Sequence, residues 1–205
     1  MSDPFGQLRQ VVTPLHAVGD TVDWRAAATE LSVEAFPGDY RRFVSAYGAG
    51  SIEDSLYVSI PRPGESTAPL TVGRLPDDTL RAESMGGWRD RGAASRYELE
   101  DMVVWGQTNG ADALCWATAD RDPDRWPVAV WARQQGGWSV YDCGFAEFIL
   151  RLLRADFATC PISVASLWGK GTARFLNLRE EERLRDEGLD PWTGEPDPFA
   201  GMEFD

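Results

Sequence analysis

The sequence predicts an α+β domain, with an antiparallel or mixed sheet of about five to six strands and with N-terminal and C-terminal helices packed on one face. Three observations predict it. Segments with helical spacing open and close the chain, strand-like segments with short links lie between them, and 43% of the 205 residues are hydrophobic. That fraction is enough for a buried core, and helices that flank a continuous run of strands are typical of the α+β class.

Two short helices are expected at the start of the chain. The first covers 4–12, where Pro4 lies in the first turn and its missing N–H costs little. The second covers 24–31, where Asp23 is placed to cap an alanine-rich segment.

A third helix begins after Pro37 and ends at a pair of glycines. Its apolar side chains recur at the i, i+3, i+4, i+7 spacing of one buried face: Tyr40, Phe43, Val44 and Tyr47. Gly48 and Gly50 do not form a dinucleotide-binding loop, because the helix precedes them and Glu53 stands at the third glycine position. Gly48 is instead expected to be the positive-φ residue that ends the helix.

The middle of the chain is expected to be extended. The predicted strands are Ser55–Ile60, Met102–Thr108, Ala113–Thr118, Pro127–Ala132 and Trp138–Tyr141. The links at 109–110 and 135–137 are typical of hairpins, and 119–124 is a polar turn, so the last four strands form an antiparallel meander. A stretch over 76–100, interrupted at 86–87, is predicted to be partly helical.

The C-terminal part is expected to return to helix. Residues 144–155 carry apolar side chains at helical spacing, which predicts an amphipathic helix on the sheet. A last helix is expected over 173–187, followed by a proline-rich loop or tail over 190–205. We therefore divide the chain into a domain over 1–172 and an acidic C-terminal helix and tail over 173–205.

The charge of the chain limits the classes of partner that it is expected to bind. The net charge is −13, and residues 179–205 alone hold ten acidic and three basic side chains. Such a surface repels nucleic acid and anionic lipid and attracts a basic protein, although acidity also serves solubility alone. No signal peptide or membrane helix is visible, so a cytoplasmic location is expected, with Cys115, Cys143 and Cys160 reduced.

The sequence carries no clear catalytic, cofactor or metal motif. His16 is the only histidine, which excludes a metal site with two imidazoles from one chain. The spacing at 164–172 departs from a phosphate-binding loop, and the acids at 120–124 lack the glycine and the final glutamate of a calcium loop. Paired carboxylates are numerous, which leaves an enzyme using surface carboxylates as the alternative to a binding protein. We expect no catalytic residue, no cofactor and no metal.

Three blocks of sequence together resemble a known family. The first is Phe36-Pro37-x-x-Tyr40-x-x-Phe43-Val44-x-x-Tyr47-Gly48-Ala49-Gly50-Ser51-Ile52. The second is Trp105-Gly106-x-x-x-x-Ala111-Asp112-x-Leu114-x-Trp116, and the third is Trp126-Pro127-Val128, Trp138-x-x-Tyr141 and Gly144-Phe145-x-x-Phe148-Ile149-x-x-Leu152. In order and spacing these blocks, spanning about 23–155, are similar to the SUKH superfamily, which contains bacterial Syd and the yeast Smi/Knr cell-wall regulators. Ala49 and Ala111 depart from frequent glycines, 61–100 does not align, and the tail beyond 173 lies outside.

The resemblance implies a non-enzymatic scaffold that binds proteins. Bacterial relatives are commonly immunity proteins that neutralise polymorphic toxins, including nucleases, and an acidic surface suits a basic toxin. The expected function is therefore that of an immunity protein with a basic toxin domain as partner. The alternative within the family is an intracellular regulatory scaffold with several partners. The oligomeric state is left open.

The residues expected to contact the partner lie on loops that we place at one side of the sheet. They are Glu53 and Asp54 after the glycines, Asp77, Asp78, Trp88 and Asp90 in the unaligned region, Asn109 and Asp112 in the hairpin, and Asp120, Asp122 and Asp124 in the polar turn. Trp88 is either an exposed anchor or a residue folded onto the sheet. Asp112 either faces the partner or bonds the Asn109–Gly110 turn.

Overall fold

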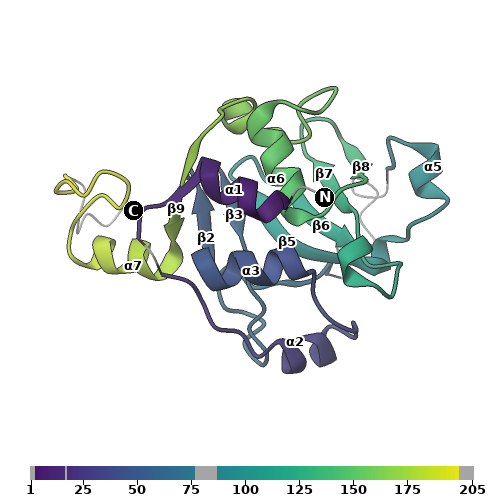
Figure 1. Cartoon of the computed structure of the whole chain (residues 1–205), viewed down its shortest axis with the longest axis horizontal. Coiled ribbons are helices and arrows are strands. Elements are labelled where there is room, and N and C mark those ends of the chain that lie inside the picture. The colour runs from purple at the N-terminus through teal and green to yellow at the C-terminus, as the bar shows by residue number, and fades with distance from the viewer. Residues whose placement is uncertain (1–2, 17, 77–86, 199–205) are drawn as a thin grey trace, which may run out of the picture.

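A computed structural model describes residues 3–16, 18–76 and 87–198, and within them the chain forms six α-helices and a nine-stranded mixed sheet (Figure 1). The helices are α1 (Pro4–Val11), α2 (Trp24–Glu30), α3 (Gly38–Tyr47), α5 (Arg91–Ala94), α6 (Phe145–Arg154) and α7 (Leu178–Asp186). The strands are β1 (Val12–Pro14), β2 (Gly50–Ile52), β3 (Leu56–Val58), β4 (Gly73–Arg74), β5 (Met102–Thr108), β6 (Ala113–Ala117), β7 (Val128–Ala132), β8 (Gly137–Tyr141) and β9 (Ala173–Asn177).

The predicted α+β class is confirmed, and the predicted number of strands was too low. The strands lie in the order β1-β9-β2-β3-β5-β6-β7-β8, with β4 paired to β5. All pairs are antiparallel except β1 and β9, which run parallel. The meander β5–β8 is confirmed within a residue or two of each expected end.

Three of the four additional strands are short and carry little local signal. β1 and β2 have three residues each and β4 has two, so none of them is long enough to show the alternation of a half-buried strand. Their pairing comes from backbone ladders with distant partners: Gly50 in β2 is opposite Asn177 in β9, and Val12 in β1 is opposite Ala173. The expected strand at 55–60 is reduced to Leu56–Val58.

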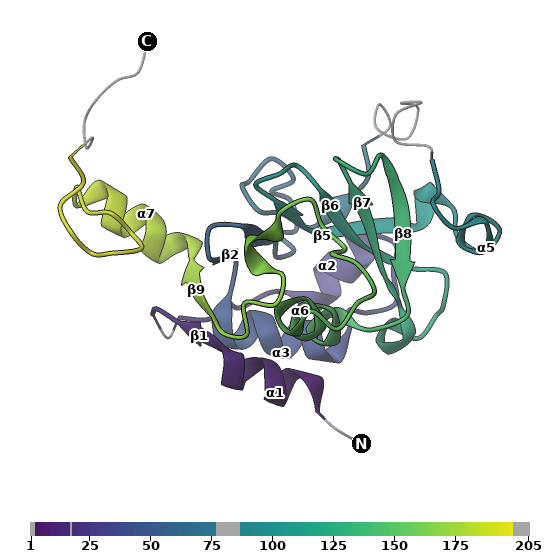
Figure 2. The same ribbon diagram turned by 90° about the horizontal axis from the view of Figure 1, so that it is seen from above.

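The predicted helix over 173–187 is wrong in its first part. Residues 173–177 form β9, which is inserted between β1 and β2, and the helix begins only at Leu178. The side chain of Asn177 separates the two elements, because its Oδ1 accepts from the Arg179 N–H (3.0 Å) and so caps α7. From β9 the chain continues into α7, which stands at one end of the molecule (Figure 2).

The main core lies between the sheet and the helices α1, α3 and α6, which are grouped on one face (Figure 2). The predicted buried face of α3 is confirmed, since Tyr40, Phe43, Val44 and Tyr47 are at most 2% exposed. The rings of Tyr40 and Phe43 contact aromatic side chains of β6, α6 and β9. Tyr40 Oη also donates to the Ser59 carbonyl (2.5 Å). Each buried aromatic removes about 150–250 Å² from water, so this cluster dominates the packing of the helical layer.

The opposite face of the meander is covered by irregular chain. Trp88, Tyr97 and Leu99 pack against a second cluster that includes Met102 and Trp138. Within the stretch 76–100, where a partly helical region was expected, the described residues hold only α5 and the start of a single 3₁₀ turn at Leu99–Asp101. Residues 77–86 lie outside the described residues.

The two glycines after α3 are required by β9. Gly48 adopts φ +75°, as expected for the residue that ends the helix, and a Cβ there would lie 2.4 Å from Asn177 Nδ2 and from Asp20 Oδ2. A Cβ on Gly50 would lie 2.1 Å from the Leu176 carbonyl oxygen. The glycine pair therefore allows β2 to approach a strand that is more than 120 residues away in the sequence.

Candidate functional site

The residues expected to contact a partner do not form one surface. The β5–β6 turn and the β6–β7 loop leave opposite ends of β6, so Asn109 and Asp112 are separated from Asp120, Asp122 and Asp124 by the length of the strand. Our expectation of one common side is therefore wrong for these two groups. Trp88 and Asp90 form a third group at the β8 edge, and Asp77 and Asp78 lie outside the described residues.

The β6–β7 loop holds its three aspartates in fixed positions. Asp120 Oδ1 accepts from the Asp122 N–H (2.9 Å), and Asp122 Oδ1 accepts from the Asp124 N–H (3.1 Å). Asp124 Oδ1 accepts from the Gly38 N–H (2.6 Å) at the start of α3. The indole of Trp126 donates to the Asp120 carbonyl (2.5 Å) and closes the loop. Each carboxylate uses one oxygen inside the fold, which orients the side chain without neutralising it.

Two arginines, Arg121 and Arg125, lie among the three aspartates of this loop, and only Arg125 forms an ion pair with one of them among the described residues. Arg125 lies 3.4 Å from the second oxygen of Asp120, while Asp122 and Asp124 are exposed and have no ion pair among the described residues. Helix α7 differs, because its Arg183 and Arg185 pair with Glu180 and Glu181 of the same helix and with Glu187 directly after it. The most acidic segment of the sequence is therefore partly neutralised by its own arginines, whereas Asp122 and Asp124 have no ion pair among the described residues.

At the other end of the sheet, Asp112 is structural. It is 1% exposed, and its oxygens accept from Thr108 Oγ1 (2.8 Å), the Arg133 N–H (2.9 Å), the Ser163 N–H (2.7 Å) and Ser163 Oγ (2.5 Å). These bonds join the β5–β6 turn to the segment after α6. The Asn109 amide donates to the Asp54 carbonyl (2.9 Å), so the two turns at this end support one another.

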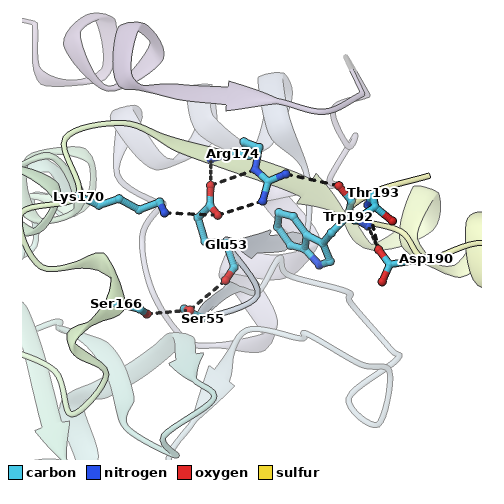
Figure 3. Close-up of polar contacts among 8 residues, drawn as sticks. All are labelled: Glu53, Ser55, Ser166, Lys170, Arg174, Asp190, Trp192 and Thr193. Atoms are coloured by element: carbon cyan, nitrogen blue, oxygen red, sulfur yellow. Dashed lines mark hydrogen bonds and ion pairs between the residues drawn. The ribbon is translucent and has the colours of Figure 1, made fainter. Parts of the chain in front are cut away.

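Glu53 is held by two cations, Arg174 of β9 and Lys170 of the segment just before it (Figure 3). Its carboxylate accepts from the Arg174 N–H (2.7 Å) and guanidinium (3.2 Å) and lies 3.7 Å from Lys170 Nζ. Burial raises the pKa of Glu53, but the hydrogen bonds and charges of Arg174 and Lys170 outweigh it and leave the pKa below its usual 4.5. Glu53 therefore connects the β2–β3 turn to β9 and is already paired.

The C-terminal turn completes this network. The Arg174 guanidinium lies 5.2 Å from the ring centroid of Trp192 and donates to the Trp192 carbonyl (3.4 Å). Asp190 organises the turn by accepting from the Trp192 and Thr193 N–H groups (2.8 and 2.9 Å) (Figure 3). Of the acids predicted at this end, only Asp54 is exposed, and its Oδ1 accepts from Tyr57 Oη (2.6 Å).

Trp88 lies on the sheet and is half-buried. Its ring centroid is 6.2 Å from that of Trp138, and the Arg89 N–H donates to the Trp138 carbonyl (2.9 Å) across the edge of β8. Asp90 is exposed and caps α5 by accepting from the Gly92 N–H (2.8 Å). The sequence left two interpretations of Trp88 open, an exposed anchor or a residue folded onto the sheet. In the structure the ring is folded onto the sheet.

One carboxylate, that of Asp39, has a raised pKa of the kind that an enzyme would use. Burial raises the pKa of Asp39, as does the nearby charge of Asp124. Both Asp39 oxygens, however, accept from helix N–H groups, those of Tyr40 (2.7 Å) and Ala146 (2.8 Å), so this carboxylate joins the starts of α3 and α6. No group of three His, Cys, Asp or Glu side chains among the described residues is placed to hold a metal ion.

Sequence reasoning missed the residues that pair with the predicted acids. Arg174, Lys170 and Trp192 come from segments beyond the resemblance, and only the excess of basic over acidic residues at 131–178 hinted at a cationic partner for Glu53. Asp39 and Glu147 were missed because neither belongs to a charged run. Of the helices that the structure describes, none combines the length and the apolar character that crossing a bilayer would need.

Comparison with known families identifies the family of this chain. Residues 23–149 match a SUKH family model described as SMI1-KNR4 cell-wall. The match runs from the cap of α2 into α6 and includes β2 through β8. No curated protein and no solved structure matches the chain.

Proposed function

The chain belongs to the SUKH family described as SMI1-KNR4 cell-wall, since the match spans more than half of its length, and on this premise we propose that it is an immunity-type protein that binds and neutralises a basic toxin domain in the cytoplasm. Domains of this family are generally non-catalytic and of the immunity or cell-wall type. The protein acts by binding alone, with the sheet and helices as a rigid support for charged loops.

The β6–β7 loop carries this proposal. It presents Asp120, Asp122 and Asp124 from a hydrogen-bonded loop in which each side chain keeps one carboxylate oxygen free of backbone bonds. Preorganised charges at an exposed loop speed association with a partner of opposite sign and suppress partners of like sign. A basic toxin domain fits this surface better than it fits α7, where Glu180 and Glu181 are paired with arginines of the same helix.

A matched pair of variants tests the proposal. Asp120→Asn/Asp122→Asn/Asp124→Asn keeps an acceptor oxygen at each position and removes three charges. Glu182→Gln/Asp186→Asn/Glu195→Gln removes three charges from exposed acids of the C-terminal part. Each protein is co-expressed with the toxin domain encoded beside its gene, and the affinity is measured by calorimetry at low and high salt.

We expect the first variant to protect cells less well and to bind more weakly with a flatter salt dependence, because three attractive charges are missing at the contact. The second variant should protect like the unaltered protein. Equal affinity of the first variant and the unaltered protein would remove the β6–β7 loop from the interface.

The family description also supports a second candidate, a regulatory scaffold that acts in cell-wall control. The two functions differ in gene neighbourhood: an immunity protein is expected directly beside a large toxin gene, and a regulatory scaffold is not. Protection against a neighbouring toxin on co-expression would exclude the scaffold as the sole function.

A further inference from the structure

A groove runs along one flank of the β6–β7 loop, where the first residues of α1, α3 and α6 converge. It encloses about 530 Å³. Its walls are apolar and stiff, since they are formed by Pro4, Pro37, Pro123 and Trp126, and the carboxylates of Asp39, Asp124 and Glu147 line it. An apolar groove with acidic sides suits a ligand group that is both flat and positively charged.

The helix ends use only part of this negative charge. Asp39 accepts from the Tyr40 and Ala146 N–H groups with its two oxygens, and Asp124 accepts from the Gly38 N–H with one. The second oxygen of Asp124 has no hydrogen bond among the described residues. Glu147 forms one ion pair among the described residues, with Arg151 one turn away, at 4.0 Å. Two carboxylates of the groove therefore keep acceptor capacity for a ligand.

Among the described residues, no cation that lines the groove is free to neutralise it. Arg42 lines it, but its guanidinium bonds both oxygens of Asp3 (3.0 and 3.2 Å) and lies 5.0 Å from the Phe5 ring centroid. The charge of Asp124 raises the pKa of Asp39 more than the charge of Arg42 lowers it. Three helix N-termini contribute about half a positive charge each, which three carboxylates exceed.

We propose that this groove receives an arginine side chain of the basic partner, with its guanidinium bonded to Asp124 and Glu147 and its aliphatic part along the proline walls. The inference rests on the proposed function, because it names the anchor by which a basic toxin domain would be held. Arginine fits better than lysine, because a planar fork bonds two carboxylates at once and is weakly hydrated, whereas an ammonium group is a compact, strongly hydrated charge.

The test uses the isolated full-length protein and a small probe. Arginine with an acetylated amino group and an amidated carboxyl group is titrated into ¹⁵N-labelled protein, with lysine capped in the same way as the comparison. The reporters are the amides of Gly38 and Gly144 and the indole N–H of Trp126, all of which belong to residues that line the groove. We expect saturable shifts of these signals with capped arginine and clearly weaker shifts with capped lysine.

Three variants make the test specific. Asp124→Asn keeps the acceptor for Gly38 and removes the charge, while Glu147→Gln alters a side chain that caps no helix, so the second variant remains informative if the first disturbs the loop. Each should reduce the affinity for capped arginine several-fold. Glu182→Gln/Asp186→Asn, which removes two exposed charges from α7, should leave it unchanged.

Shifts that do not saturate, shifts that are equal for arginine and lysine, or shifts spread over α7 as strongly as over the groove would overturn the proposal. Its failure is separable from failure of the proposed function. If capped arginine does not bind while the loop variant still loses protection against the toxin, the partner uses the loop without an arginine anchor. If the loop variant protects as well as the unaltered protein, the β6–β7 loop is removed from the interface, and only a lack of protection by the unaltered protein makes the proposed function fail.

Discussion

Replacement of Gly50 by alanine tests whether β9 is a structural part of this domain. The added Cβ would lie 2.1 Å from the Leu176 carbonyl oxygen and 2.9 Å from Asn177 Cα, whereas ordinary contacts begin at 3.4 Å. Both atoms belong to backbone, so β2 and β9 must separate by more than 1 Å. Overpacking of this kind costs about 1–3 kcal/mol, and each weakened ladder hydrogen bond adds about 0.5–1.5 kcal/mol.

We therefore expect Gly50→Ala to lower the free energy of unfolding by about 3 kcal/mol, which corresponds to a fall in Tm of about 6–12 °C for a chain of this length. The matched control is Gly73→Ala in β4, where a Cβ would meet no atom within 4 Å. The assay is thermal and urea unfolding followed by circular dichroism. A Gly50→Ala variant as stable as the control would refute the conclusion that close contact with β9 requires glycine at position 50.

Three further predictions concern the same scaffold. Truncation after Thr172 removes β9 from between β1 and β2, so we expect the shortened chain to lose cooperative unfolding. Truncation after Pro198 should preserve cooperative unfolding. A cooperative transition in the chain that ends at Thr172 would make 1–172 an independent domain. Asp112→Ala leaves buried donors of Thr108, Arg133 and Ser163 unpaired and should lower the free energy of unfolding in urea by about 3 kcal/mol or more. Unchanged stability with weaker partner binding would instead place Asp112 in the interface. Because the pKa of Glu53 is lowered in the folded state, its contribution to stability is complete above the unfolded value near 4.5 and is lost as the pH falls through the folded value. The stability difference between the unaltered protein and Glu53→Gln should therefore shrink on acidification below 4.5, and a pH-independent difference would contradict the ion pairing.

Local patterns in the sequence were sufficient for the long elements. The spacing of Tyr40, Phe43 and Tyr47 predicted α3 and its buried face, because a helix brings residues three and four apart to one side. The meander followed from alternating strands with short polar links. The cap of α2 followed from Asp23, whose Oδ1 accepts from the Ala26 N–H (3.0 Å). These features depend on interactions within a few residues, which a sequence displays directly.

For the candidate surface, the sequence predicted which acidic residues lie in loops but not which of them are paired. The aspartates of the β6–β7 loop and the turn residues Glu53 and Asp112 were all found as acidic loop residues. Their different roles were not visible, because whether a carboxylate is free or paired depends on what lies opposite it. Glu53 is paired by Arg174, which follows it by 121 residues, and Asp112 is bonded by Ser163 after 51 residues.

By itself, then, the sequence determined the fold class, the family signature and the list of charged loops. The tertiary structure decided the place of β9 in the sheet, the reason for the glycines beside it, and which acids remain free for a partner. The physical reason is the range of the interactions. Helical and strand periodicities arise between near neighbours, whereas strand order, close backbone approach and ion pairing arise between segments that meet only once the chain has folded.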